Sequence, residues 1–433
     1  MRKARRIEDK ISSRILRHPL FYVCRDIERA IGLVPNFPNY YIITNASPLA
    51  ARLAKKYRQI ILIKGRENLD TWELLQLPQT KKIISAQGGS ALGGKPNILV
   101  FKNTSQIEGL CHKMGWKLLN PSAKLAGQVE EKISQIKWLG PLVKFLPSYK
   151  VTVCKKITWT GKKFILQFNR SHTGSGTILI ASKKQLDEIK HKFPQREARV
   201  AEYISGPLFT NNNMVWSDKI LLGNISYQIT GLKPFTDLPF ATIGNDWALP
   251  YKILSPEQIK QYNKIATEVG RRLKKSGWKG LFGIDVIMKQ KTGRLYLLEI
   301  NARQPASTTY ESQLQSTVCH SDPEDSGEES LANRCTTFEA HLASLLSVSP
   351  DKYKLITIKN GAQIIQRITH KKISIRQLAD KSQISNLTKK KFNIIIYNNT
   401  EPNSDLFRIQ SKKGIMSAHN KLNKVGQAIL CCL

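Results

Sequence analysis

The chain has 433 residues, of which 41% are hydrophobic and 23% charged, a composition typical of a folded globular protein and unlike that of a disordered one. Lys and Arg number 68 against 32 Asp and Glu, so the formal net charge is +36. A field of this sign attracts polyanions and anionic small substrates alike. Because the sequence has no nucleic-acid motif with interleaved aromatic residues, nucleic acid is the disfavoured partner.

Apolar runs and cysteine spacing indicate the cellular setting. No apolar run approaches the roughly 18 residues of a membrane span, and the basic start, MRKARRIEDKISSRILRHPL, lacks the apolar core of a signal peptide. The seven cysteines are irregularly spaced, which predicts reduced thiols rather than a disulfide framework or a zinc site. We therefore expect a soluble, cytoplasmic protein of two or three domains.

Strand-like and helix-like runs alternate over residues 38–120. Short apolar runs predict strands at 40–45, 60–65 and 97–101. Helical spacing follows the first and third of these runs, with Ser47 as a helix cap and Pro48 in the first turn. The alternation predicts a parallel sheet with crossover helices, and hence an α/β domain.

The stretch 121–147 has helical spacing that ends at a Gly-Pro break, and Lys132 lies in the middle of it. We expect this lysine on a helix. A helical lysine is in most proteins a solvated surface residue, so by itself it predicts no function.

A glycine-rich segment, NRSHTGSG, joins two predicted strands that end near Phe168 and begin near Thr177. Glycine permits left-handed backbone angles and leaves room for backbone N–H groups to approach a phosphate. Arg170 and His172 add donors to this hairpin. It predicts an anion contact, and a merely flexible turn is the alternative.

The region that follows leads to the most informative stretch. A strand in VAEYISGPLF ends at Gly206, and a polar stretch over 211–231 comes next. A helix is predicted over 255–276, with Ser255 as its cap and Pro256 in its first turn.

Two strands joined by a polar turn are predicted over 281–307, in LFGIDVIMKQKTGRLYLLEINARQPAS. Strict alternation places Leu297, Glu299 and Asn301 on one face, and Asp285 on the first strand can face the same cleft. Unpaired buried carboxylates are costly, and oxygen ligands suit Mg²⁺, so these residues predict a metal site. Rim carboxylates in solvent or in structural ion pairs are the alternative.

The order of these features resembles the ATP-grasp superfamily from about Leu118 to Gln315, and the strongest match is GIDVI followed by LLEINAR. The resemblance implies an α/β plus α+β fold, with a Rossmann-like pre-ATP-grasp domain before a two-subdomain ATP-grasp fold. The implied domains are 1–120, 121–350 with a lid at about 150–205, and a small basic C-terminal α+β region at 351–433.

The resemblance also implies roles for individual residues. Asp285, Glu299 and Asn301 would bind Mg²⁺, with Glu299 bridging two ions and Mn²⁺ able to substitute. Lys132 would lie near the phosphates of ATP, and Arg303 would steady the substrate carboxylate or its acyl phosphate. The hairpin over the phosphates would comprise Ser171, His172, Thr173, Gly174, Ser175, Gly176 and Thr177. The hinge that meets adenine would comprise Glu202, Tyr203 and Ile204.

Two positions depart from the family pattern. Gln167 stands where the family commonly has a second phosphate lysine, and a glutamine donates a hydrogen bond without a charge. Arg170 and Lys163 are the candidates to compensate. The acid that often follows the hinge glycine and binds the ribose is absent, since Gly206 is followed by Pro207.

The implied activity is an ATP- and Mg²⁺-dependent, ADP-forming ligase that joins a carboxylate to an amine through an acyl phosphate. A phosphotransferase on the same scaffold and a non-catalytic basic module that binds ATP or polyanions are the alternatives. The substrates would be small molecules or peptides, with acidic ones favoured by the basic charge. Gln228 and Glu311 are candidates to line the acceptor side.

Overall fold

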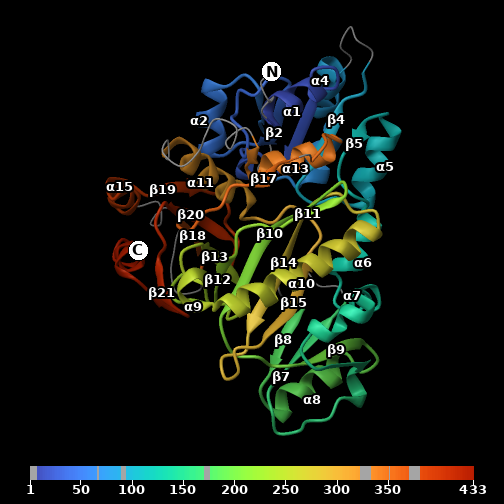
Figure 1. Cartoon of the computed structure of the whole chain (residues 1–433), viewed down its shortest axis with the longest axis vertical. Coiled ribbons are helices and arrows are strands. Elements are labelled where there is room, and N and C mark those ends of the chain that lie inside the picture. Colours follow the sequence, from blue (N-terminus) through green and yellow to red (C-terminus); the bar gives the residue numbers. More distant parts are fainter. Residues whose placement is uncertain are drawn as a thin grey trace.

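The computed structural model describes residues 7–65, 68–88, 94–169, 176–321, 333–350, 352–369 and 381–433. An α/β domain lies at the top of Figure 1, a long sheet occupies the centre, and a small sheet lies at the bottom. The predicted mixture of α/β and α+β architecture is confirmed. Within the described ranges, no helix has the length and apolar character needed to cross a membrane.

The N-terminal sheet is parallel, with the strand order β3-β2-β1-β4-β5. Its strands are β1 (Leu20–Cys24), β2 (Tyr40–Asn45), β3 (Ile60–Ile63), β4 (Asn97–Val100) and β5 (Lys117–Leu118). The helices of this region are α1 (Ile7–Ile15), α2 (Pro48–Lys56), α3 (Thr71–Gln76), α4 (Pro78–Gly88) and α5 (Ser105–Lys113). The three predicted strands are confirmed, and Ser47 caps α2 as predicted.

The central strand β1 was not predicted. Its side chains alternate between two apolar cores, with Tyr22 in one and Phe21 and Val23 in the other. Both faces of the N-terminal sheet are therefore covered, as is usual for parallel sheets.

The long central sheet is antiparallel, with the order β15-β14-β10-β12-β13-β18-β20-β19 and β11 paired to β10. Its first strands are β10 (Leu208–Trp216), β11 (Lys219–Leu221), β12 (Ser226–Thr230), β13 (Thr242–Asp246), β14 (Gly280–Met288) and β15 (Leu295–Asn301). The helix α10 (Pro256–Lys275) packs its apolar stripe against these strands. Ser255 caps this helix and forms a capping box with Gln258, in agreement with the predicted start.

The last part of the chain continues the central sheet. The strands β18 (Ala362–Arg367), β19 (Asn393–Ile396) and β20 (Asp405–Ser411) extend it beyond β13. The remaining C-terminal elements are α15 (Lys381–Lys389), β21 (Met416–Ala418), β22 (Lys421–Leu422) and α16 (Lys424–Leu430). The boundary at residue 350 remains a prediction, but the strands after it share one sheet with the strands before it.

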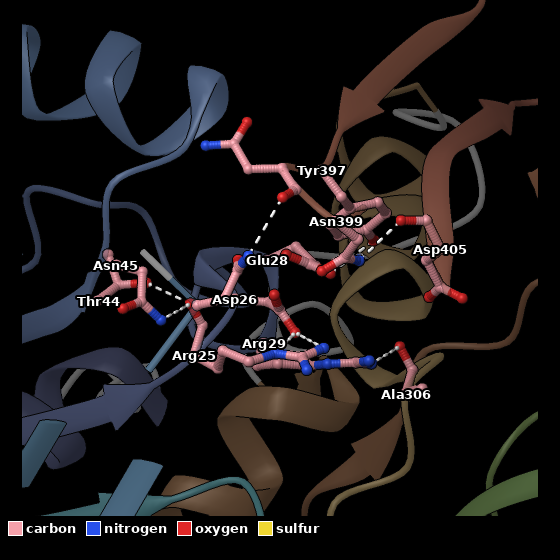
Figure 2. Close-up of polar contacts among 12 residues, drawn as sticks. Arg25, Asp26, Glu28, Arg29, Thr44, Asn45, Ala306, Tyr397, Asn399 and Asp405 are labelled. Carbon is pink, nitrogen blue, oxygen red and sulfur yellow. Dashed lines mark hydrogen bonds and ion pairs between the residues drawn. The ribbon is translucent and has the colours of Figure 1, made fainter. Parts of the chain in front are cut away.

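A buried polar network ties these C-terminal strands to the N-terminal domain. Tyr397, just after β19, donates a hydrogen bond of 2.6 Å to the Glu28 carboxylate, as Figure 2 shows. Arg408 on β20 donates to the Tyr397 hydroxyl and to Gln363 Oε1, both at 3.0 Å. Every charge in this network therefore has a partner.

The small sheet has the order β6-β9-β7-β8. It comprises β6 (Tyr149–Val153), β7 (Phe164–Phe168), β8 (Thr177–Ile180) and β9 (Glu197–Glu202). The helix α8 (Lys183–Lys192) lies between β8 and β9 in the chain. One face packs against α8 through residues such as Leu166, Ala198 and Leu186. The other face is turned toward the central sheet.

Short helices and strands complete the fold. They are η1 (Ile27–Arg29), α6 (Ala123–Glu130), α7 (Ser134–Leu139), η2 (Gly140–Phe145), η3 (Cys154–Lys156), α9 (Pro250–Ile253), α11 (Thr308–Ser321), β16 (Arg334–Cys335), α13 (Thr337–Leu345) and β17 (Lys354–Leu355). The prediction that Lys132 lies on a helix is wrong, because it lies in the turn between α6 and α7.

Candidate active site

A cavity of about 440 Å³ lies between the small sheet and the central sheet. The small sheet contributes Ile165, Gln167, Thr177, Arg199 and Ala201 to its wall. The segment 202–206 forms the connection between the two sheets and also lines the cavity. The tip of the β21–β22 hairpin, His419 and Asn420, reaches the rim, although no C-terminal residue was predicted there.

One end of the cavity is apolar. Ile204 and Ile287 pack together there, with Leu208 and Leu298 beside them. Gly206 is required at this end, because a Cβ on it would lie 1.9 Å from the Met288 carbonyl oxygen. The result is an apolar slot beside the chain segment 202–206, which suits a planar base.

The three predicted hinge residues all line the cavity. The Glu202 carboxylate accepts a hydrogen bond of 2.6 Å from Lys289 Nζ, in the turn between β14 and β15. Backbone bonds at 3.0 Å from Gln290 N to Ser205 O and at 2.9 Å from Met288 N to Pro207 O tie the same turn to the hinge. The hinge is thereby fixed to the central sheet.

The opposite end of the cavity is acidic. Asp285 on β14 and Glu299 on β15 lie directly opposite each other, and Asn301 follows at the end of β15. Asn301 Nδ2 donates to Asp285 Oδ2 at 3.4 Å. The predicted grouping of these three side chains is therefore present in the structure.

The predicted alternation along β15 is wrong at Leu298. The register shifts between Asp285 and Val286, so that Leu298 is an extra residue in the ladder. Leu298 and Glu299 then both line the cavity, whereas Leu297 packs in the main core. A β-bulge of this kind re-aims the side chain that follows it, here Glu299.

The two carboxylates have opposite electrostatic surroundings. Burial and the nearby Glu299 raise the pKa of Asp285 to about 6, and Asp285 Oδ1 is buried without a hydrogen-bond partner among the described residues. Burial acts to raise the pKa of Glu299 as well, but the ion pair with Lys132, 3.0 Å from Nζ to Oε1, holds it below its ordinary value.

These donors fit a hard divalent cation. Two carboxylates and an amide oxygen are oxygen ligands, and Asp285, whose buried Oδ1 has no hydrogen-bond partner among the described residues, lines the cavity. Within the described ranges, no group of three or more His, Cys, Asp and Glu side chains is arranged to hold a metal ion. Lys132 places a positive charge beside these ligands.

The turn that carries Lys132 is bound to the start of the glycine-rich hairpin. Asn169 Oδ1 accepts hydrogen bonds from the backbone N–H groups of Ile133 and Ser134, at 2.9 and 3.1 Å. The predicted phosphate-binding residues Ser171, His172, Thr173, Gly174 and Ser175, and Arg170, lie outside the described residues. Gly176 accepts a hydrogen bond of 3.2 Å from the Phe168 N–H and closes the hairpin.

Arg303 is held at the acidic end by a carboxylate. Its guanidinium is paired with Glu130, and the second oxygen of Glu130 lies 3.1 Å from Lys102 Nζ. This bridge runs from the loop after β15 to the loop after β4, so it joins the acidic end to the N-terminal domain.

Two arginines, Arg25 and Arg29, follow strand β1 of the N-terminal sheet. Its strand order reverses between β1 and β4, and ligands of such sheets bind beyond the carboxyl ends of these strands. Arg25 follows β1 and pairs with Asp26, while Arg29 donates to the Ala306 carbonyl at 3.1 Å (Figure 2). Arg25 and Arg29 therefore lie beyond the carboxyl end of β1, each held by a polar contact.

Gln228 and Glu311 have different places. Gln228 lines the cavity, and its Oε1 is buried with no hydrogen-bond partner in the described part of the chain. Glu311 is fully buried and is bonded to Asn212 and Asn224 instead. It packs inside the fold and does not line the cavity.

Arg199 was not among the predicted site residues, although it lines the cavity beside Gln167. Its signal in the sequence is weak: a single arginine in the strand EARVAE, which shares a face with Ala201. The sequence of a single strand does not show whether a carboxylate from another element pairs with its arginine.

The chain matches no protein-family profile, and no curated protein sequence matches it. Solved structures nevertheless share its fold. The N5-carboxyaminoimidazole synthetase from Staphylococcus aureus is 12% identical, with a TM-score of 0.61 over 95% of this chain and 96% of that one. The N5-carboxyaminoimidazole synthase from Aspergillus clavatus, in complex with ADP and 5-aminoimidazole ribonucleotide, is also 12% identical, with a TM-score of 0.62 over 96% and 98%.

An L-amino acid ligase from Bacillus licheniformis is 11% identical, with a TM-score of 0.56 over 92% of this chain and 93% of that one. All three are ATP-grasp proteins, and the match runs through both the N-terminal α/β domain and the two sheets around the cavity. The chain therefore has the ATP-grasp fold, preceded by the α/β domain that such proteins carry.

Proposed function

We propose that the protein is an ATP- and Mg²⁺-dependent, ADP-forming ligase that joins a carboxylate to an amine through an acyl phosphate. The observation that carries the proposal is the placement of Asp285 opposite Glu299, beside Lys132, at one end of a cavity whose other end is apolar. An apolar slot suits a nucleobase, and adjacent carboxylates suit the cation that accompanies phosphates.

Phosphoryl transfer asks the protein mainly for positioning and charge neutralisation. Mg²⁺ held by Asp285, Glu299 and Asn301 would supply charge neutralisation at the phosphate oxygens. Lys132 would hold a phosphate oxygen at the same end of the cavity, since its Nζ lies 3.0 Å from Glu299 Oε1. The hinge residues Tyr203 and Ile204 would offer backbone groups to the adenine.

The reaction has two balanced steps. An oxygen of the substrate carboxylate attacks the γ-phosphorus of ATP, the bond from that phosphorus to the β–γ bridging oxygen breaks, and ADP leaves. The amine nitrogen then attacks the acyl carbon, the bond from that carbon to the phosphate oxygen breaks, and inorganic phosphate leaves while the amine loses a proton. Arg303, which pairs with Glu130, would bind the acyl phosphate between the two steps.

Small-molecule substrates are favoured by the proteins that share the fold. One of them binds ADP together with 5-aminoimidazole ribonucleotide, and another is an L-amino acid ligase. The net charge of +36 would favour a substrate that carries an additional negative charge.

The test is ADP release in the presence of ATP, Mg²⁺, hydroxylamine and a panel of carboxylic acids. A ligase releases ADP only with the right acid, and hydroxylamine traps the acyl phosphate as a hydroxamate. Glu299→Gln is expected to lower this rate by at least about 100-fold, as the loss of a carboxylate essential for charge neutralisation would. Glu268→Gln, which removes an acid from the exposed pair with Arg271, is the matched control and should leave the rate unchanged.

Three results would contradict the proposal. A stable phosphorylated acid without hydroxamate would indicate a phosphotransferase. Binding of Mg·ATP without turnover of any acid would indicate a non-catalytic binding module. Unchanged turnover in Glu299→Gln would place the chemistry away from this cavity.

A further inference from the structure

Gln167, Arg199 and Thr177 form one row across the small sheet. Gln167 on β7 lies opposite Arg199 on β9 and opposite Thr177 on β8. Because neighbours opposite each other in a ladder point to the same face, all three side chains share the face that lines the cavity. Gln167 Nε2 donates a hydrogen bond of 3.1 Å to Thr177 Oγ1, so the glutamine is engaged within the sheet.

Arg199 is the charged member of this row, and it is buried. Only 1% of its surface is exposed, and its Nε and Nη1 have no hydrogen-bond partner in the part of the chain that the structure describes. No carboxylate of the described residues forms an ion pair with it. Burial lowers the pKa of Arg199 to about 10, although the nearby Tyr149 and Glu299 act in the opposite direction.

A structural role for Arg199 is poorly supported by its contacts. Its Cζ lies 5.7 Å from the centre of the Tyr149 ring, a contact worth about 1 kcal/mol, well below the cost of a buried charge without hydrogen bonds. Arg408 shows how this fold treats a structural arginine, because its Nε and Nη1 donate to Tyr397 and Gln363. Arg199 Nε and Nη1 have no such partners among the described residues, and its side chain lines a cavity.

We propose that Arg199 binds the phosphates of the nucleotide and supplies, from the neighbouring strand, the positive charge that Gln167 lacks. The inference rests on the proposed function, since it concerns the nucleotide end of the same cavity. A guanidinium offers a planar fork of donors that matches two phosphate oxygens, so one arginine replaces a lysine at this face. The ligand class is a nucleoside di- or triphosphate, and the charge lies across the cavity from Asp285 and Glu299.

The test compares calorimetric binding of two probes, Mg·ADP and adenosine, which differ in their phosphates. The variants are Arg199→Met, the double variant Gln167→Lys/Arg199→Met and the control Lys150→Met. The double variant moves the positive charge from position 199 to position 167. Lys150 is an exposed cation on β6 of the same sheet and does not line the cavity, so its loss matches the charge change. If Arg199→Met does not fold, Arg199→Gln, which keeps donors but no charge, takes its place.

Arg199→Met is expected to weaken Mg·ADP binding by about tenfold or more, as the loss of a charge-assisted hydrogen bond predicts. Its adenosine affinity should stay within about twofold of wild type, and Lys150→Met should bind both probes normally. The double variant should regain most of the lost Mg·ADP affinity, because the lysine at 167 faces the same cavity.

Equal Mg·ADP binding by wild type and Arg199→Met would overturn the inference and leave the proposed function standing. An equal loss of ADP and adenosine would also overturn it, because Arg199 would then only shape the small sheet. A wild-type protein that binds neither probe would refute the proposed function itself, and the inference with it.

Discussion

Gln167 and Arg199 lie directly opposite each other on neighbouring antiparallel strands, with a neutral amide beside a buried arginine that has no ion-pair partner among the described residues. A buried charge without hydrogen bonds destabilises the fold. Such a charge is retained where a ligand supplies the missing partner. Removal of the Arg199 charge is therefore expected to raise stability and to weaken nucleotide binding.

Arg199→Met should therefore raise the free energy of unfolding of the unliganded protein by about 1 kcal/mol or more, because the cost of burying an unpartnered polar group disappears. Denaturant unfolding without nucleotide measures it. The control is Arg408→Met, which removes a second buried arginine of the described residues together with its hydrogen bonds to Tyr397 and Gln363; it should lower the same free energy by about 3 kcal/mol. A loss of stability in Arg199→Met of similar size would contradict the assignment of Arg199 to a ligand.

Glu130 pairs with two cations, and its replacement should lower both stability and the rate of catalysis while nucleotide binding is kept. In Glu130→Gln, Arg303 and Lys102 lose their shared carboxylate, whose side chain is only 12% exposed. We expect the free energy of unfolding to fall by about 1–3 kcal/mol and hydroxamate formation to fall about tenfold, while Mg·ADP binding is retained.

The matched control for this change is Glu268→Gln. Its pair with Arg271 has the same chemistry but is exposed, so the variant should lose less than about 1 kcal/mol and no activity. Hydroxamate formation by Glu130→Gln at the wild-type rate would show that Arg303 does not depend on Glu130 for its position.

Local signals predicted much of this fold correctly. Helix starts at Ser47 and Ser255 were predictable because a cap needs only a side-chain oxygen and the backbone N–H groups that follow it. Asp285, Glu299 and Asn301 were predictable as a group because they lie at the ends of two strands joined by a short turn.

Features that depend on distant parts of the chain were not predictable. The strand β1 is buried on both faces, so LFYVC shows no alternation to mark it. The extra residue Leu298 depends on how β15 pairs with β14, and LYLLEIN alone gives no sign of it. Whether Arg199 has a hydrogen-bond partner depends on the side chains of every element around the cavity. Among the described residues, its Nε and Nη1 have none.

Gly206 should be intolerant of any side chain. Its backbone φ is +153°, and a Cβ would lie 1.9 Å from the Met288 carbonyl oxygen, in a hinge tied to the central sheet. Gly206→Ala is expected to lower the free energy of unfolding by about 2–4 kcal/mol and to weaken Mg·ADP binding, because the hinge must move.

Gly109→Ala is the control for that change. Gly109 lies within α5, and a Cβ there meets nothing within 4 Å, so alanine should stabilise the protein by up to about 1 kcal/mol. Similar unfolding midpoints for the two variants would mean that the hinge adapts to a methyl group.

Glu311 should make stability depend on pH. Burial raises its pKa from the ordinary 4.5 to about 7, although hydrogen bonds from Asn224 and Asn212 act in the opposite direction. Because the pKa is higher in the fold than in the unfolded chain, the protonated carboxyl stabilises the fold. That contribution is complete below pH 4.5 and is lost as the pH rises through 7.

Glu311→Gln keeps a neutral group of the same shape and removes the titration. The free energy of unfolding of wild type should therefore fall relative to that of the variant between pH 5 and pH 8, by on the order of 3 kcal/mol. Denaturant unfolding of both proteins across this range measures the difference. Parallel curves for wild type and Glu311→Gln would mean that Glu311 keeps its charge inside the fold, and that Asn212 and Asn224 compensate its burial in full.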